Sequence, residues 1–319
     1  MSNEVIVLIT KDRPSTLEKT LEQLGNGDTN TIIMDDSITD VTYKLVSDRY
    51  KRRNITYHGK SEQNALLLKY KNLKLKSFIK PLGMKDWNLG FVRNYALIVA
   101  KSFGYEKVLF MDDDIIVRHL ECVEQIFVKA SSYDFVGARI TGMADDSVVG
   151  HVMRVCDGEF FEFLSGGFLA FNINKVSEYF LNYYNEDQIW LFLHSMGTRF
   201  ESCCEVVQQQ YDPFENAVMK ALKQEYGEIL EEGAEEAFRC GNHHLLLKND
   251  FWKEICDTRL DYLNRLPELL VHKEINYIGL SIYRALIDYH SKISQESFIS
   301  VFRQYFENRG LWNTILVSI

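Results

Sequence analysis

Apolar residues in the first part of the chain form short continuous runs, separated by segments with helical spacing. Continuous runs of this length are typical of strands that are buried on both faces of a parallel sheet. The predicted strands are 4–9, 31–34, 55–58 and 107–111. The predicted helices are 14–24, 39–53, 61–80 and 88–103. This alternation predicts a parallel sheet with helices on both faces.

The alternation becomes looser after residue 114. Further strands are predicted around glycine-rich turns, at 135–140, 159–172 and 199–208, with a helix at 186–196. The remainder is mostly helical, with predicted helices at 216–238, 260–289 and 296–305. A boundary near Pro213 divides the chain into residues 1–211 and residues 212–319. The predicted fold class is α/β, a mixed and mainly parallel sheet flanked by helices, with a mostly helical C-terminal region.

The composition is that of a globular protein with a large core. Of 319 residues, 46% are hydrophobic and 25% are charged, and there are 20 Phe and 17 Tyr. The formal charge is -9, so we expect no nucleic-acid partner held by bulk phosphate attraction. The longest apolar runs, such as 96–100, are shorter than the roughly 20 residues of a membrane span, and no signal-peptide pattern is visible. We therefore expect a cytoplasmic protein without a membrane span.

The cysteines carry no metal-binding pattern, because none of the six forms a Cys-x-x-Cys pair. Cys203 and Cys204 are adjacent, and alternation along a strand predicts that their side chains point to opposite faces. Reduced thiols are the expectation for a cytosolic protein. That expectation covers Cys122, Cys156, Cys203, Cys204, Cys240 and Cys256.

Carboxylates directly follow two of the predicted parallel strands, as Asp35 and Asp36 and as Asp112, Asp113 and Asp114. In open α/β sheets the ligand crevice lies outside the carboxyl ends of the strands. A single Asp in this position is as often a helix cap or a turn former. Three in succession repel one another unless a cation or a solvated loop relieves the charge. Alternation places Asp112 and Asp114 on one side, where two hard oxygen ligands suit Mg²⁺ or Mn²⁺ with a diphosphate.

Three other segments carry candidate binding or catalytic residues. Arg93, near the start of a predicted helix, is placed to meet an anion, although a solvated helix face would explain it equally. The small residues 165–167 allow a ligand to approach the backbone closely. Glu186 and Asp187 open a further predicted helix, where acidic residues often only complement the helix dipole.

Taken in order, these segments resemble the GT-A glycosyltransferases, in particular family 2 of the inverting nucleotide-sugar enzymes. The resemblance covers roughly residues 4–210, about two-thirds of the chain. The matching segments are 7–14, 33–37, 90–96, 110–114, 165–167 and 186–187. The resemblance implies a GT-A, Rossmann-like fold and a hexosyltransferase-type enzyme. Its donor would be a nucleoside-diphosphate sugar, with UDP as the nucleotide that the family favours.

The resemblance also implies roles for individual residues. Asp114, with Asp112, would bind Mn²⁺ or Mg²⁺, which neutralises charge on the leaving diphosphate. Asp187, paired with Glu186 in the family's Glu-Asp position, would be the general base that deprotonates the acceptor hydroxyl, with inversion at the anomeric carbon. The nucleotide-sugar would be held by Thr10, Asp35, Asp36, Arg93, Asp112, Asp113, Gly166 and Gly167.

The sequence departs from the family at one point. Many relatives carry a histidine behind the strand that follows the Glu-Asp helix, where this chain has residues 206–211 without one. A histidine ligand for the metal would have to come from His244 or from its neighbour His243. Ordinary surface or helix-cap roles are the alternative for both.

The acceptor and the role of residues 212–319 are not identified by any motif. Acceptor recognition and homo-oligomer formation through the C-terminal helices are both open. A sugar nucleotidyltransferase is an alternative function, but it needs a glycine-rich phosphate loop after the first strand, and residues 10–14 contain no glycine. A protein that binds a carbohydrate or a partner on a GT-A fold without turnover is the non-enzymatic alternative.

Overall fold

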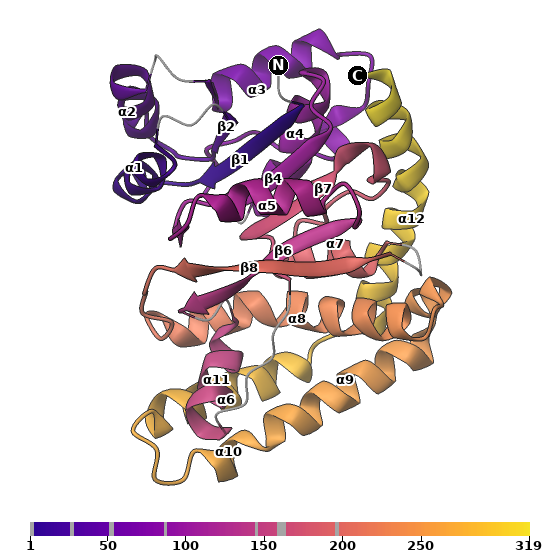
Figure 1. The fold of residues 1–319 in the computed structure, drawn as a ribbon. Coiled ribbons are helices and arrows are strands. Elements are labelled where there is room, and N and C mark those ends of the chain that lie inside the picture. The colour runs from indigo at the N-terminus through magenta and orange to yellow at the C-terminus, as the bar shows by residue number, and fades with distance from the viewer. Residues whose placement is uncertain are drawn as a thin grey trace.

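The computed structural model describes residues 3–25, 29–50, 54–85, 88–143, 146–157, 164–194 and 198–319. In these residues eight strands form one sheet, in the order β3-β2-β1-β4-β7-β6-β8-β5 (Figure 1). The strands are β1 Glu4–Thr10, β2 Asn30–Asp35, β3 Ile55–His58, β4 Lys107–Asp112, β5 Ile115–Ile116, β6 Phe135–Gly142, β7 Phe168–Asn172 and β8 Phe200–Gln208. The pairs among β1, β2, β3 and β4 are parallel, and β6 is parallel to β8, whereas β7 runs antiparallel to β4 and β6.

Helices cover both faces of this sheet and then continue as a C-terminal region. Those within the first part are α1 Pro14–Gln23, α2 Val41–Arg49, α3 Lys60–Lys69, α4 Leu89–Ser102, α5 Glu121–Lys129, α6 Val148–Asp157 and α7 Glu186–Phe192. The C-terminal helices are α8 Ala217–Arg239, α9 Asn249–Asn264, α10 Leu266–Leu269, α11 Asn276–His290 and α12 Gln295–Ser318. Short 3-10 turns are η1 Leu75–Ser77, η2 Ile173–Lys175 and η3 His243–Leu247. The predicted fold class is therefore confirmed.

The continuous apolar run of β1 is explained by burial on both of its faces. Val5 and Val7 belong to a hydrophobic cluster that includes α4 and α7. Ile6 and Leu8 belong to a second cluster on the opposite face, together with Leu17 of α1. Since no side of β1 meets water, the sequence shows no polar alternation there.

Several elements differ from the sequence prediction. The helices α5 and α6 and the short strand β5 were not predicted, and the strand expected over 159–172 is present as β7 alone, with 158–163 outside the described residues. The helix expected over 260–289 is divided into the end of α9, α10 and α11. Pro267 lies near the start of α10, and a proline cannot continue an existing helix without loss of a hydrogen bond. His272 then adopts a left-handed backbone conformation, with φ of 66°.

The C-terminal region shares a hydrophobic core with the sheet. In Figure 1, α12 runs from the C-terminal helices back along the side of the sheet toward the N-terminal part. Trp312 of α12 packs on Phe78 with ring centroids 5.1 Å apart, and Tyr305 stacks on Tyr179 at 4.7 Å. Side chains from both sides of the boundary expected at residue 211 thus pack in one hydrophobic cluster, and the division into two parts stays a prediction. Across the described segments, no helix has the length and apolarity needed to cross a membrane.

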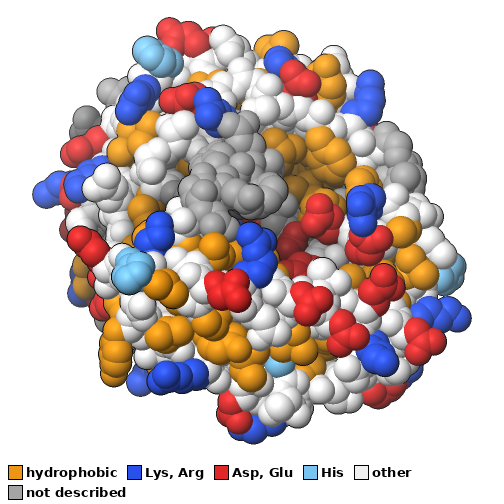
Figure 2. All heavy atoms as spheres, turned by 90° about the horizontal axis from the view of Figure 1, so that it is seen from below, with side chains coloured by type: hydrophobic (Ala, Val, Ile, Leu, Met, Phe, Trp, Pro, Cys, Tyr) orange, Lys and Arg blue, Asp and Glu red, His pale blue; other side chains and the backbone are white. Residues whose placement is uncertain are grey.

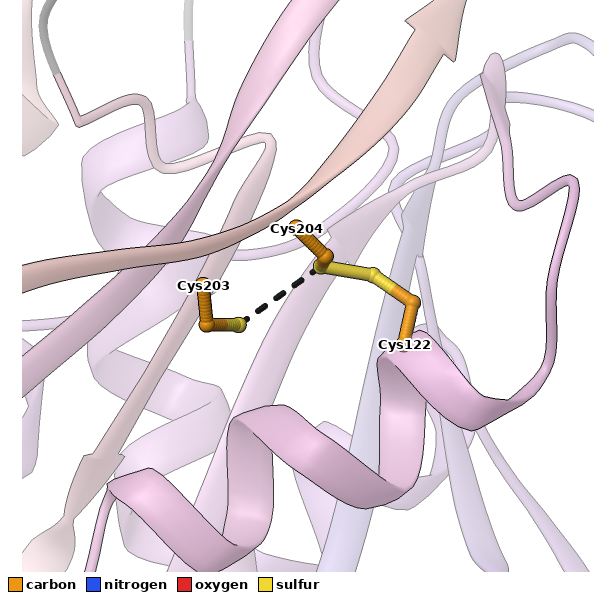
Figure 3. Close-up of a disulfide and its surroundings, with 3 residues drawn as sticks. All are labelled: Cys122, Cys203 and Cys204. Atoms are coloured by element: carbon orange, nitrogen blue, oxygen red, sulfur yellow. Dashed lines mark hydrogen bonds between the residues drawn. A yellow bond between two sulfur atoms is a disulfide. The ribbon is translucent and has the colours of Figure 1, made fainter.

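The expectations for three cysteines are wrong. Cys122 on α5 and Cys204 on β8 form a disulfide, with 5.9 Å between their Cα atoms, instead of two reduced thiols. Cys203 and Cys204 do not point to opposite faces, because their Sγ atoms lie 3.6 Å apart (Figure 3). The reason is a bulge: the stretch 202–205 of β8 pairs with the shorter stretch 137–139 of β6. An extra residue in one strand interrupts the alternation of side chains.

Candidate functional site

The carboxyl ends of three neighbouring parallel strands bring the predicted polar residues to one edge of the sheet. Thr10 at the end of β1 is opposite Asp35 at the end of β2. Ile9 is opposite Asp112 at the end of β4. Because β1, β2 and β4 are adjacent and parallel, their following loops meet at the same edge, which is where ligands bind in open α/β sheets.

The turn at Gly166 and Gly167 brings two carboxylates from different elements together. The Asp112 amide donates to the Gly167 carbonyl at 3.0 Å, and the Gly166 amide donates to Asp187 Oδ2 at 2.5 Å. A Cβ atom on Gly166 would lie 2.7 Å from the Cβ of Asp187, and one on Gly167 would lie 3.3 Å from Asp112 Oδ2. The turn therefore needs glycine at residue 166, because the α7 carboxylate approaches the backbone closely.

Arg93 of α4 is buried at the centre of this arrangement, with 2% of its surface exposed. Its Nε donates to Glu186 Oε1 at 3.1 Å and its Nη1 donates to the Gly166 carbonyl at 2.9 Å. Its Nη2 lies 3.7 Å from Asp112 Oδ1. The guanidinium therefore links β4, the glycine turn and α7, and it balances carboxylates that would otherwise repel one another.

Glu186 and Asp187 differ in what they can reach. Glu186 is buried and paired with Arg93, and burial raises its pKa against the opposing effect of that arginine. Asp187 is partly exposed, and its Oδ1 accepts the Gln188 amide at 2.9 Å. Of the two, Asp187 is thus the carboxylate that a ligand can contact, and its two oxygens are oriented by backbone N–H groups.

Asp113 and Asp114 follow β4 and lie beside Arg13, which belongs to the loop after β1. Asp113 has no exposed surface, and it accepts the Thr10 hydroxyl at 2.6 Å and faces Arg13 Nη2 at 2.5 Å. Burial raises the pKa of Asp113 to about 7, with Arg13 opposing the rise. Asp114 Oδ2 accepts from Arg13 Nη1 at 2.9 Å, whereas its Oδ1 is buried and has no hydrogen-bond partner among the described residues. Arg13 is a site residue to which the sequence prediction gave no role.

The two carboxylates after β2 are also bonded to the protein. Asp35 accepts the Tyr57 hydroxyl at 2.6 Å. Asp36 accepts from Lys11 Nζ at 2.8 Å and from the Gly83 amide at 2.7 Å. Both side chains are buried, and their hydrogen bonds to Tyr57, Lys11 and Gly83 stabilise the segments around the strand ends. Their predicted contact with a donor nucleotide stays a prediction.

The candidate metal ligands fit a divalent cation only in part. The unpartnered Oδ1 of Asp114 and the partly exposed carboxylate of Asp112 are hard oxygen ligands at a strand end. Over the described ranges, no group of three or more His, Cys, Asp or Glu side chains could hold a metal by itself. A cation at Asp114 would therefore need further oxygen ligands from a diphosphate and water.

His244 is not brought to the strand ends. It lies exposed on η3, and its neighbour His243 bonds through Nε2 to the Phe192 carbonyl at the C-terminal end of α7, at 2.9 Å. Glu186 and Asp187 lie at the opposite end of that helix. The role of His244 as a metal ligand stays a prediction.

Carboxylates on α8 form a second acidic group beside the site. Arg259 Nη1 lies 3.2 Å from Glu228 Oε2 and 2.8 Å from Glu232 Oε1, and burial raises the pKa of Glu228 to about 7. Glu228 Oε1 also accepts from Asn185 Nδ2 at 3.0 Å, directly before α7. Figure 2 shows one face of the molecule with a hollow in and around which acidic side chains gather. The i, i+3, i+4 spacing of glutamates on α8 was visible in the sequence, but their neighbours were not.

The pKa of Asp113 predicts how stability depends on pH. Burial raises the pKa of the Asp113 carboxyl in the folded state to about 7. The folded protein therefore keeps a proton on Asp113 that the unfolded chain releases above about pH 4. Wild-type stability should fall relative to Asp113→Asn as pH rises from about 4 to about 7, by up to about 1.4 kcal/mol per unit, and then level off. Urea unfolding of both proteins across this range measures the difference. If the difference in the free energy of unfolding between the two proteins did not change with pH, the raised pKa of Asp113 would be contradicted.

The chain matches no protein-family model and no curated protein sequence. Solved structures with a similar arrangement include a mannosyltransferase from Pyrobaculum calidifontis in complex with GDP-Man and Mn²⁺. That structure has 13% sequence identity and a TM-score of 0.49, covering 99% of this chain and 84% of its own.

Two further structures share part of the arrangement. A protein described as a nucleotide-diphospho-sugar transferase from Desulfovibrio desulfuricans has 10% identity and a TM-score of 0.37, covering 66% of this chain and 83% of its own. Mouse xyloside xylosyltransferase 1 has 8% identity and a TM-score of 0.33, covering 59% and 72%. These likenesses are too distant to support an activity, so we base the functional proposal on the geometry of the site.

Proposed function

We propose that the chain is a metal-dependent glycosyltransferase that moves a sugar from a nucleoside-diphosphate sugar to an acceptor hydroxyl. The observation that carries this proposal is the convergence of Asp112 and Asp187 on the turn at Gly166 and Gly167, beside buried Arg93. Both carboxylates are partly exposed, and they come from a strand end and a helix start on either side of one turn. A metal-dependent sugar transfer uses two such carboxylates, one that would hold a cation at the leaving diphosphate and one that accepts the proton of the attacking hydroxyl.

In the proposed reaction some of the carboxylates bind the cation and another acts as the general base. Asp114 and Asp112 would hold a divalent cation, which would supply positive charge at the leaving diphosphate. Asp187 accepts the proton of the acceptor hydroxyl while that oxygen attacks the anomeric carbon and the bond from this carbon to the diphosphate oxygen breaks. Attack and departure on opposite faces invert the anomeric centre. Glu186 stays paired with Arg93 and keeps the start of α7 against the glycine turn.

The donor nucleotide is proposed to lie at the ends of β1 and β2. The side chains of Thr10, Asp35, Asp36 and Asp113 are bonded to protein groups, so we propose that they shape the loops around the nucleoside. A UDP-hexose is the donor that the family resemblance favours. The acceptor is proposed to enter beside α8, since Glu228 of that helix contacts Asn185 directly before the catalytic pair. The cytoplasmic location and a homo-oligomer stay predictions.

The experiment that tests this function is a thermal-stability screen with UDP, GDP, TDP and CMP, each with Mn²⁺ and with a chelator. A nucleotide at about a hundred times its dissociation constant stabilises the fold by roughly 2.7 kcal/mol, which raises the melting temperature measurably. We expect one diphosphate to raise it in Mn²⁺ and not in chelator. If folded protein responds to no nucleotide, the transferase proposal is wrong, and binding without turnover becomes the better explanation.

Asp114→Ala should abolish the metal-dependent part of that stabilisation, roughly the whole 2.7 kcal/mol at the same nucleotide concentration. The reason is that Asp114 supplies the unpartnered buried oxygen of the proposed cation site. Asp40→Ala is a matched control, because Asp40 is an exposed carboxylate paired with a cationic side chain on the surface. The same thermal screen measures both variants. An Asp114→Ala protein that keeps the full Mn²⁺-dependent shift would show that the cation binds elsewhere.

A further inference from the structure

A third cysteine lies beside the disulfide that joins α5 to β8. The Sγ of Cys203 is 3.6 Å from the Sγ of Cys204, which is bonded to Cys122. Figure 3 shows the three sulfur atoms in succession, with that of Cys204 in the middle. A thiolate that reaches a disulfide sulfur from the side away from its partner is placed for thiol–disulfide exchange.

The fold brings these sulfurs together through two local features. The bulge in β8 directs Cys203 and Cys204 to the same side of the strand. Cys122 lies in the first turn of α5, which packs across that side. Cys122 is only 5% exposed, whereas Cys203 and Cys204 are partly exposed. The residues that carry the attacking and central sulfurs are thus partly exposed, and the residue that carries the leaving sulfur is buried.

We propose that Cys122, Cys203 and Cys204 form a thiol–disulfide exchange site with two alternative disulfides. The thiolate of Cys203 attacks the Sγ of Cys204, a Cys203–Cys204 bond forms and the Cys122–Cys204 bond breaks. Cys122 leaves as a thiolate and takes up a proton from water. One disulfide and one thiol are present before and after the step, so the exchange needs no oxidant or reductant.

Burial of Cys203 and the charges around it favour exchange at higher pH. Burial raises the pKa of its thiol, and Glu201 acts in the same direction. Lys129 of α5 opposes them, and its Nζ lies 2.6 Å from Glu201 Oε1. Because only the thiolate attacks, the rate should increase as Cys203 is deprotonated.

The exchange would break the disulfide that joins α5 to β8, and Cys122 of that disulfide follows the proposed metal ligand Asp114 by eight residues. The Asp114 carbonyl accepts the Gln209 amide at 3.0 Å, and Ile115 of β5 pairs with Gln208 of β8. The segment between Asp114 and Cys122 is therefore held to β8 at both of its ends. After the exchange only the non-covalent contacts would remain at the Cys122 end. This consequence for Asp114 rests on the proposed function, whereas the exchange itself does not.

Disulfide mapping by mass spectrometry tests the exchange. Purified protein is held at about pH 7 and about pH 9, quenched with acid, unfolded in denaturant so that buried thiols react, labelled with N-ethylmaleimide and digested. At the lower pH we expect label on Cys203 and a Cys122–Cys204 linkage. At the higher pH a second population should carry label on Cys122 and a Cys203–Cys204 linkage, at a rate independent of protein concentration.

Two variants separate this exchange from other chemistry. In Cys203→Ser, label on Cys122 should fall about tenfold or more, because the internal nucleophile is gone. Cys240→Ser removes an exposed free thiol elsewhere and should change nothing. Cys203→Ala replaces the serine variant if that one does not fold. The proposal is overturned if wild-type Cys122 is never labelled, if the Cys122–Cys204 linkage is absent, or if labelling persists without Cys203. None of these outcomes depends on glycosyltransferase activity.

Discussion

Asp187→Asn should lower turnover by about 10²–10⁴-fold and leave nucleotide binding unchanged, the range typical for loss of a general base. Asparagine keeps the shape of the side chain and can still accept the Gly166 amide, which Asp187 Oδ2 accepts at 2.5 Å. What it loses is the capacity to take the proton of the acceptor hydroxyl. The expected loss therefore appears in kcat rather than in donor binding.

Donor hydrolysis, with water as the acceptor, measures this effect even before the natural acceptor is known. Asp250→Asn is a matched control, because Asp250 is an exposed carboxylate in the first turn of another helix, α9. It should turn over donor at the wild-type rate. Unimpaired turnover in Asp187→Asn, together with normal nucleotide binding, would remove Asp187 as the base.

Arg93→Met should lower the free energy of unfolding by about 3–5 kcal/mol, the range for breaking a buried ion pair from one side. Methionine fills part of the volume, but Asp112 and Glu186 lose the cation that lies between them. The Gly166 carbonyl also loses its donor. We expect the metal-dependent nucleotide shift to disappear as well, because β4 and α7 are no longer held against one turn.

Urea unfolding measures the loss, with two variants for comparison. Arg93→Lys keeps the charge but cannot reproduce the planar fork that contacts Glu186 and Gly166, so an intermediate loss is expected. Arg303→Met removes a surface arginine paired with Glu296 and should cost no more than about 1 kcal/mol. If Arg93→Met were as mild as Arg303→Met, Arg93 would not be the centre of the site.

The strands and the residues at their ends were predictable because the pattern that encodes them is local. A run such as 4–9 is apolar throughout when both faces are covered, and this is what the two clusters on either side of β1 show. Once β1, β2 and β4 are parallel neighbours, Thr10, Asp35 and Asp112 must lie at one edge. The sequence thus determined the α/β class and which carboxylates lie together.

The sequence did not determine how those carboxylates are partnered. The position of Arg93 near the donor stays a prediction, whereas its pairing with Glu186, 93 residues further along the chain, was not predicted. Asp113 is paired with Arg13, which the sequence prediction left without a role. A motif shows that a charge is present, whereas burial decides whether it faces a ligand or another side chain.

Only the tertiary structure decided the features that depend on packing between distant elements. One bulged residue in β8 turned Cys203 to the same side as Cys204, and the packing of α5 placed Cys122 within bonding distance. The contact of Glu228 with Asn185 likewise requires α8 to lie against the start of α7. Hydrophobic periodicity is read over a few residues and fixes local elements. Register, bulges and the partners of buried charges are fixed by contacts between residues that are far apart in the chain. No local sequence pattern contains those contacts.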